Sequence, residues 1–263
     1  MTNRIRLELV PLVLLAAVAV LVLGSAFRDA RARGRRADAT ALSHDTTIVR
    51  AGVVQGAVRR ELVPRGAQQS VPPAELRRRV LNLRDGTYVD DILAEQDSAL
   101  YRWPEHLSNA LRVYIAPESP IIGWDPRYPT MAREVFDEWS EAGFPLRFAF
   151  IYDSTSADIA IRWIERFPVE EGQRIGVTDR MQSSDYEIAK ARVGIANHDS
   201  TGRALSVAAV GGILRHEIGH ALGLNHAADQ TSVMYRASAT TSIAPSDRAT
   251  LRLLYLVPGG SLK

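Results

Sequence analysis

The sequence predicts an α+β domain in residues 101–258, built on a twisted mixed sheet backed by helices. Two observations support this fold class. The hydrophobic pattern changes along the segment in the order strand, helix, strands, helix, helix. The composition allows a packed core, because 46% of the 263 residues are hydrophobic and 24% are charged.

Four segments are expected to form the strands of this sheet. Leu111–Ile115 alternates apolar and polar side chains and stops shortly before Pro117, as a half-buried strand does. The remaining strands are expected at residues 145–152, 158–163 and 192–196.

Three segments are expected to form helices. In residues 129–142, Val135 and Trp139 lie four positions apart on one face, and a glycine follows directly as a helix end. The second and third helices are expected at residues 206–222 and 245–256.

Residues 1–27 are expected to be a signal peptide or a single-pass membrane anchor. The nineteen residues from Leu9 to Phe27 carry no charge and would span about 28 Å as a helix, close to the hydrocarbon thickness of a bilayer. Five arginines follow at once. They would hold that side of an anchor in the cytoplasm and would slow the export of a cleaved chain, so both alternatives stay open.

Residues 28–100 are expected to be a linker or pro-like segment that is partly disordered. The segment contains arginine runs, small residues and two consecutive prolines, with little sustained periodicity. Residues 74–83 fit a short basic helix, and residues 87–94 are expected to be ordered and to lead into the folded domain.

The composition excludes several kinds of site. The chain has no cysteine, so disulfides, thiolate metal sites and cysteine nucleophiles are excluded. Residues 101–263 carry 17 basic and 19 acidic side chains, and the positive excess lies in the N-terminal third. No nucleic-acid partner is expected, because the basic charge is not gathered on one face.

One short segment of the second expected helix carries the chemistry. His216 and His220 are four residues apart, so both imidazoles leave the same helix face and can bind one metal ion. Gly223 is expected to end the helix and turn the chain, so that His226 returns as a third ligand. Three nitrogen ligands leave a fourth position for water, as one catalytic zinc ion requires.

Glu217 is the expected catalytic base. It follows His216 directly and projects about 100° around the helix, beside the metal and not on it. From there its carboxylate can take a proton from a metal-bound water.

The segment HEIGHALGLNH, residues 216–226, resembles the extended zinc signature of the metzincin metallopeptidases. Residues 232–235, Ser-Val-Met-Tyr, resemble the Met-turn of that superfamily, in which the methionine, here Met234, forms a hydrophobic floor beneath the zinc. The short spacing and the Met-Tyr order resemble the matrixin branch. The resemblance covers about residues 101–257.

This resemblance implies a zinc-dependent endopeptidase with a metzincin fold that acts on peptide or protein substrates. Such an enzyme would be exported, and it would be attached to the membrane through residues 1–27 if these are not cleaved. The substrate is expected to lie extended along the fourth strand, near Val193 to Asn197. The loop from Tyr235 to Ala244 is expected to form one wall of the specificity pocket.

The sequence departs from the matrixin pattern in several places. Ala227 stands where matrixins usually have serine, and Arg236 stands where proline usually follows the Met-Tyr pair. Between residues 164 and 205 only His198 offers an imidazole, which argues against a second zinc, and the scattered acidic residues leave calcium open but unsupported. Latency through a propeptide cysteine is excluded, so either residues 27–100 inhibit through another contact or the enzyme is not latent.

Two other functions stay open. The domain could be a non-catalytic, zinc-stabilised binding module at the cell surface, although such a module has no need of Glu217. It could also hydrolyse non-peptide amides.

Overall fold

The computed structural model describes residues 58–63, 71–104, 110–238 and 240–263. The helices of this part are α2 (Pro73–Leu83), α3 (Val89–Glu95), α4 (Tyr128–Ser140), α5 (Val207–Ala221) and α6 (Pro245–Leu256). The strands are β1 (Val58–Val63), β2 (Ala99–Leu100), β3 (Leu111–Ile115), β4 (Phe148–Ile151), β5 (Ile159–Ile164), β6 (Gly176–Ser183), β7 (Ile188–Ala196) and β8 (Gly260–Ser261). The expected signal or anchor segment lies outside the described residues.

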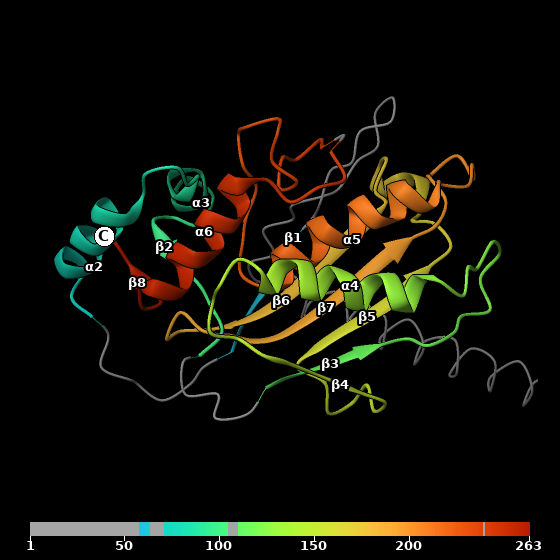
Figure 1. The fold of residues 1–263 in the computed structure, drawn as a ribbon, viewed down its shortest axis with the longest axis horizontal. Coiled ribbons are helices and arrows are strands. Elements are labelled where there is room, and N and C mark those ends of the chain that lie inside the picture. The colour runs from blue at the N-terminus through green and yellow to red at the C-terminus, as the bar shows by residue number, and fades with distance from the viewer. Residues whose placement is uncertain (1–57, 64–70, 105–109, 239) are drawn as a thin grey trace, which may run out of the picture. The chain divides into compact units, whose positions relative to one another are not determined.

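The main sheet has the order β1-β6-β7-β5-β3-β4 (Figure 1). β6 runs antiparallel to β7, and the other neighbouring pairs are parallel. α4 and α5 lie over one face of this sheet (Figure 1). The predicted α+β class with a mixed sheet is therefore confirmed.

All seven predicted helices and strands of this domain are present, and the largest difference lies at β6 and β7. β3 and α6 have the predicted bounds, and α5 differs by one residue at each end. The fourth predicted strand is the second half of the longer β7, and β6 before it was not predicted. The sequence pattern of β6 hides the strand, because its inward positions are the polar residues Thr178, Arg180 and Gln182.

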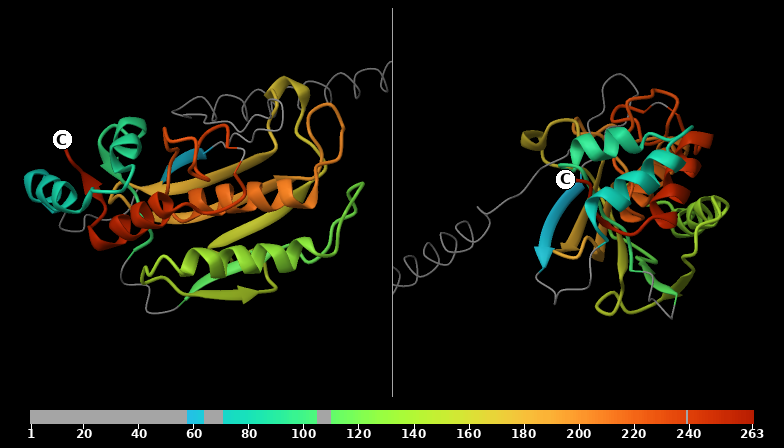
Figure 2. Two further views of the ribbon diagram at one scale, coloured as in Figure 1. Left: turned by 45° about the horizontal axis from the view of Figure 1, so that its top comes forward. Right: turned by 90° about the vertical axis from the view of Figure 1, so that its left-hand side faces the viewer.

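The expectation that a substrate pairs with the fourth strand is wrong. β7 is hydrogen-bonded to β5 along one edge and to β6 along the other, so its backbone groups are already paired. β6 is the next strand of the sheet after β7, on the side away from β5. Its outer edge pairs in parallel with β1, which is blue in Figure 2.

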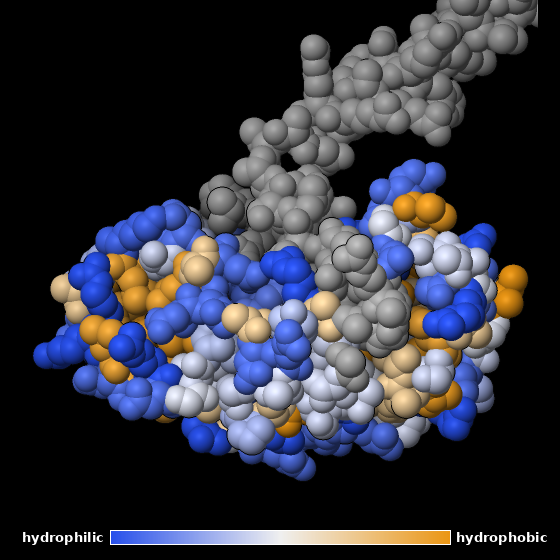
Figure 3. Space-filling view, turned by 90° about the horizontal axis from the view of Figure 1, so that it is seen from above, coloured by the Kyte–Doolittle hydropathy of each residue, from blue (hydrophilic) through white to orange (hydrophobic). Residues whose placement is uncertain are grey.

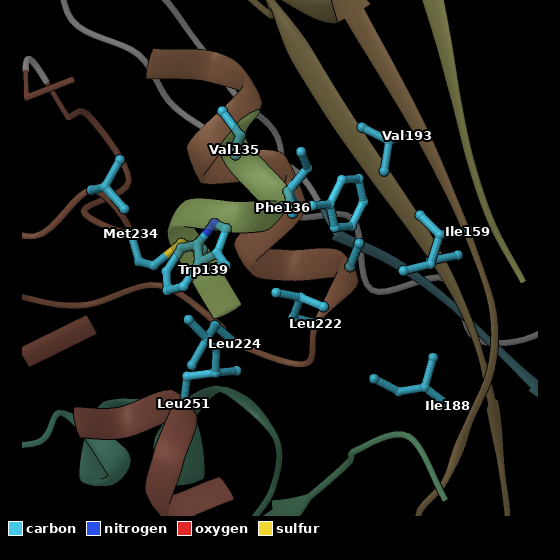
Figure 4. Close-up of a cluster of buried hydrophobic side chains, with 14 of the residues drawn as sticks. Val135, Phe136, Trp139, Ile159, Ile188, Val193, Leu222, Leu224, Met234 and Leu251 are labelled. Atoms are coloured by element: carbon cyan, nitrogen blue, oxygen red, sulfur yellow. The ribbon is translucent and has the colours of Figure 1, made fainter. Parts of the chain in front are cut away.

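One hydrophobic core fills the space between the sheet and the helices, and Figure 4 shows part of it. Phe136 and Trp139 of α4 are fully buried there, opposite Ile159 of the sheet. Burying a side chain of this size contributes roughly 1.5–3 kcal/mol, so α4 is held by packing more than by helix propensity.

The same core continues into the residues before β2. Leu76 of α2 and Ile92 of α3 are buried within it. β2, which follows α3, pairs antiparallel with β8 near the other end of the described chain. The segment 71–100 is thus packed on the domain and held by its C-terminal strand.

The face seen from above is mainly polar, with apolar side chains toward both ends of the molecule (Figure 3). α2 lies at the left-hand end in Figure 1 and leaves Leu81 and Leu83 exposed. Within the described residues, none of the helices combines the length and the apolar character that crossing a bilayer requires.

Candidate metal centre

α5 has a defined start and a defined end. The Ser206 hydroxyl accepts a hydrogen bond from the backbone N–H of Ala209 at 3.1 Å, which caps the first turn. Beyond the last turn, Gly223 has a φ of +113°. A Cβ at this position would lie 2.8 Å from the Leu254 side chain and 3.0 Å from the Tyr101 carbonyl oxygen. The turn therefore requires glycine for both its backbone conformation and its space.

This turn brings three predicted ligands together. The candidate ligand atoms of His216, His220 and His226 lie within 4.8 Å of one another, and all three side chains are buried. The Nε2 atoms of His216 and His220 are 3.1 Å apart. Two nitrogens bound at about 2.0–2.1 Å to one tetrahedral zinc ion stand about 3.3 Å apart, so the spacing fits a shared metal.

The second ring nitrogen of each imidazole faces an acceptor. Nδ1 of His216 lies 2.7 Å from the Val233 carbonyl oxygen, and Nδ1 of His220 lies 2.9 Å from the Leu224 carbonyl oxygen. A carbonyl only accepts hydrogen bonds, so both Nδ1 atoms carry the proton in the neutral ring. The two facing Nε2 atoms then both present lone pairs, an arrangement that a metal ion between them stabilises.

Burial keeps these imidazoles neutral. Loss of solvent, reinforced by the neighbouring His226, lowers the pKa of His216 to about 3. Burial, together with the other two imidazoles, also lowers the pKa of His220 well below its ordinary value. Neutral imidazole is the form that binds zinc, so the site is prepared for a metal at neutral pH.

Glu217 lies on the side of α5 that faces β6. The Thr178 hydroxyl is 2.7 Å from Oε2 of Glu217 and 3.0 Å from its backbone carbonyl oxygen, so it donates to this residue. A Cβ on Gly176 would lie 2.3 Å from the other carboxylate oxygen. β6 therefore leaves room for the carboxylate with a glycine and fixes it with a hydroxyl.

The family model described as Matrixin matches residues 103–256, which is more than half of the chain. This chain belongs to the matrixin family. Among solved structures, myroilysin is similar, with 14% identity, a TM-score of 0.39, and coverage of 59% of this chain and 85% of that chain. A comparison with curated proteins found no match.

Met234 of this matrixin lies against the helix that carries the histidines. Figure 4 shows its sulfur beside the ring of Trp139. A Cβ on Gly219 would lie 2.4 Å from that sulfur and 3.0 Å from Trp139. The absence of a side chain at Gly219 thus lets Met234 approach α5 directly between its two histidines.

The start of α6 holds the turn around Met234 in place. Asp247 is fully buried and accepts hydrogen bonds from the Ser232 hydroxyl, from the Val233 N–H at 3.0 Å and from the Ala244 N–H at 2.7 Å. The N–H of Met234 donates to the Ser232 hydroxyl at 2.9 Å. Since the Val233 carbonyl accepts from His216, one peptide segment connects Asp247 to the first ligand.

The third histidine of this matrixin has a partner from outside the matched residues. Nδ1 of His226 lies 3.2 Å from Oε1 of Glu95, and the His226 N–H donates to Oε2 at 3.2 Å. Arg236 and Asn225 also donate to this carboxylate. Burial raises the pKa of Glu95, but the contacts with His226 and Asn225 outweigh burial and lower it.

Arg180 of β6 supports the same turn from the other side. Its guanidinium donates to the carbonyl oxygen of His220 at 3.1 Å and to Oδ1 of Asn225 at 2.7 Å. Sequence reasoning missed Arg180, Asp247 and Glu95 as parts of the site. The one local signal was the charge of Arg236, which pairs with Glu95 in the structure.

Other expected features are separate from this centre. Within the described ranges, the three histidines are the one group of at least three His, Cys, Asp or Glu side chains placed to hold a metal. His198 instead lies with Nδ1 2.8 Å from Oδ1 of Asn197. A calcium site therefore has no support in this part of the chain.

Proposed function

We propose that this matrixin is a zinc-dependent metalloendopeptidase. One zinc ion is held by His216, His220 and His226, and Glu217 acts as the general base. The observation that carries the proposal is the set of three buried imidazoles with closely spaced ligand atoms. The backbone carbonyl oxygens that face Nδ1 of His216 and His220 orient the two rings so that their Nε2 atoms face each other.

A zinc ion bound there would supply Lewis-acid chemistry, acidifying a water molecule and polarising the scissile carbonyl. The Glu217 carboxylate takes the proton from the attacking water and passes it to the departing amine. Thr178 keeps this carboxylate in one orientation through its hydrogen bond to Oε2. Met234 closes the floor of the site and excludes water from below.

The substrate is a peptide or protein segment. β6 holds Glu217 through Thr178, so we place an extended substrate along the outer edge of β6, where it would take the place of β1. The loop from Tyr235 to Ala244 remains the proposed wall of the specificity pocket. We also propose that the protein is exported, either secreted or anchored through residues 1–27.

The test is cleavage of a diverse quenched-peptide library by residues 27–263. The wild type is expected to cleave peptides, and a chelator is expected to abolish cleavage. Glu217→Ala is expected to bind one zinc per chain and to lose several orders of magnitude in turnover.

Two other results would contradict the proposal. A wild-type protein that binds one zinc and cleaves no peptide would favour the non-catalytic binding module or a hydrolase of non-peptide amides. An alanine variant with near-normal turnover would remove Glu217 from the mechanism.

A further inference from the structure

The hydrogen bonds of the three histidines differ in one respect. His216 and His220 direct Nδ1 at backbone carbonyl oxygens, whereas His226 directs Nδ1 at the Glu95 carboxylate. A backbone carbonyl oxygen is present whatever side chain its residue carries. The described partner of His226 Nδ1 is therefore a particular side chain, that of Glu95.

This side chain belongs to a segment outside the family match. Glu95 is the last residue of α3, and the matched residues begin at 103. In sequence, Glu95 lies 131 positions before His226. At this separation the contact cannot form locally. The two residues meet only when the domain has folded.

α3 holds the loop around His226 at several points. Oδ2 of Asp91 accepts from the Ala228 N–H at 2.8 Å, and Oε2 of Glu95 accepts from Nδ2 of Asn225 at 3.0 Å. The residues on both sides of His226 are thus bound to the same helix. The ligand is held between them.

α3 is itself fixed from both ends. The Tyr88 N–H donates to the Thr250 hydroxyl of α6 at 3.0 Å, and Ile92 is buried in the core. After α3, the carbonyl oxygen of Ser98 accepts from the Leu262 N–H at 2.8 Å. A helix anchored in this way presents Glu95 from a rigid position.

Arg236 balances the charge of Glu95. Its guanidinium lies 2.5 Å from Oε1 of Glu95, the same oxygen that faces His226. Arg236 stands two residues after Met234, so the ion pair also connects α3 to the turn beneath the histidines. This contact accounts for an arginine at a position where matrixins usually have proline.

We propose that Glu95 is a positioning residue of the metal centre, and that α3 is a working part of the site despite lying upstream of the matched domain. The carboxylate fixes the tautomer and the ring orientation of His226 and makes its Nε2 a better donor to a metal. The inference rests on the proposed zinc site. It predicts that segment 71–100 cannot be removed without weakening metal binding.

The test compares Glu95→Ala, Glu95→Gln and the matched control Asp90→Asn in the full chain. Asp90 lies on the same helix, and its exposed carboxylate reaches Arg84 at 3.6 Å. Zinc affinity is measured by competition with a chromophoric chelator. The visible spectrum of the cobalt-substituted protein reports the ligand geometry, and unfolding of the metal-free protein reports stability.

We expect Glu95→Ala to bind zinc about 10–100-fold more weakly and to change the cobalt spectrum. Glu95→Gln keeps an oxygen acceptor for Nδ1, so a loss of only a few-fold is expected. The control is expected to bind zinc as the wild type does. Wild-type zinc affinity and an unchanged cobalt spectrum in Glu95→Ala would overturn the proposal, even if the metal-free variant were less stable.

The outcome is independent of peptide cleavage. If the wild type binds zinc and cleaves nothing, the proposed peptidase function fails, while the affinities of the Glu95 variants still decide the role of α3. If the wild type binds no zinc, both proposals fail together, and the cobalt spectrum shows it directly.

Discussion

Asp247 is the residue whose replacement tests most directly how the site is supported. Its carboxylate is buried at the start of α6 and accepts from Ser232, Val233 and Ala244. Replacement by alanine removes all three acceptor contacts at once. Replacement by asparagine keeps one carbonyl oxygen of nearly the same shape.

The expected loss follows from burial of the abandoned donors. Ser232 and Val233 are fully buried, and each unpaired donor costs about 1–3 kcal/mol. Water can reach the partly buried Ala244, and removal of a buried carboxylate relieves part of the cost. We therefore expect Asp247→Ala to lower the free energy of unfolding by about 3 kcal/mol, which corresponds to a decrease in Tm of about 6–12 °C.

The assay is denaturant unfolding of the chelator-treated protein, with Asp247→Asn as the matched control. The asparagine variant is expected to lose about 1 kcal/mol, because its amide oxygen can still accept from Val233. Zinc affinity provides a second measurement. It is expected to fall in Asp247→Ala, since the Val233 carbonyl positions His216. An alanine variant within about 0.5 kcal/mol of the wild type would refute this account of the turn.

Three further predictions concern the site and its surroundings. Gly176→Ala is expected to reduce kcat at least tenfold with little loss of stability, because its Cβ would displace the Glu217 carboxylate. Steady-state kinetics and a melting curve measure the two effects, and an unchanged kcat would contradict the prediction. The metal-free protein is expected to lose stability as the pH falls from about 6.5 toward 3. Over this range His216 is protonated in the unfolded chain but stays neutral in the folded protein. Because folding lowers the pKa of His216 from its ordinary value to about 3, the free energy of unfolding falls by about 5 kcal/mol once the pH is below both pKa values. A flat unfolding profile over this range would contradict the burial of the imidazole. Replacing residues 58–63 with a glycine–serine stretch is expected to lower KM at constant kcat, because β1 occupies the edge of β6 where a peptide would pair, and an unchanged KM would show that the two do not compete.

Local chemistry was predictable from the sequence. His216, His220 and Glu217 share one helix, so their relative placement follows from helix geometry alone. Gly223 was expected to end that helix, and the helix ends at Ala221 with a positive φ at Gly223. The third ligand could be placed because only a tight turn separates it from the helix.

Long-range supports were not predictable in the same way. β6 carries Thr178 and Arg180 on its inward face, and a strand that hydrogen-bonds to a helix lacks the apolar alternation that reveals strands. Glu95 is one acidic residue among several in its segment, and its contact with His226 depends on the whole fold. Neither residue has a local pattern that distinguishes it from a solvated surface side chain.

The pairing of β2 with β8 has a consequence for the time at which the centre is completed. A ribosome that has released residues 1–226 has delivered every histidine of the triad, but not Asp247 or the strand at residues 260–261 that holds the segment after α3. The ligands therefore exist before their supports. The metal centre is therefore fully supported only after the strand at residues 260–261 has paired with β2.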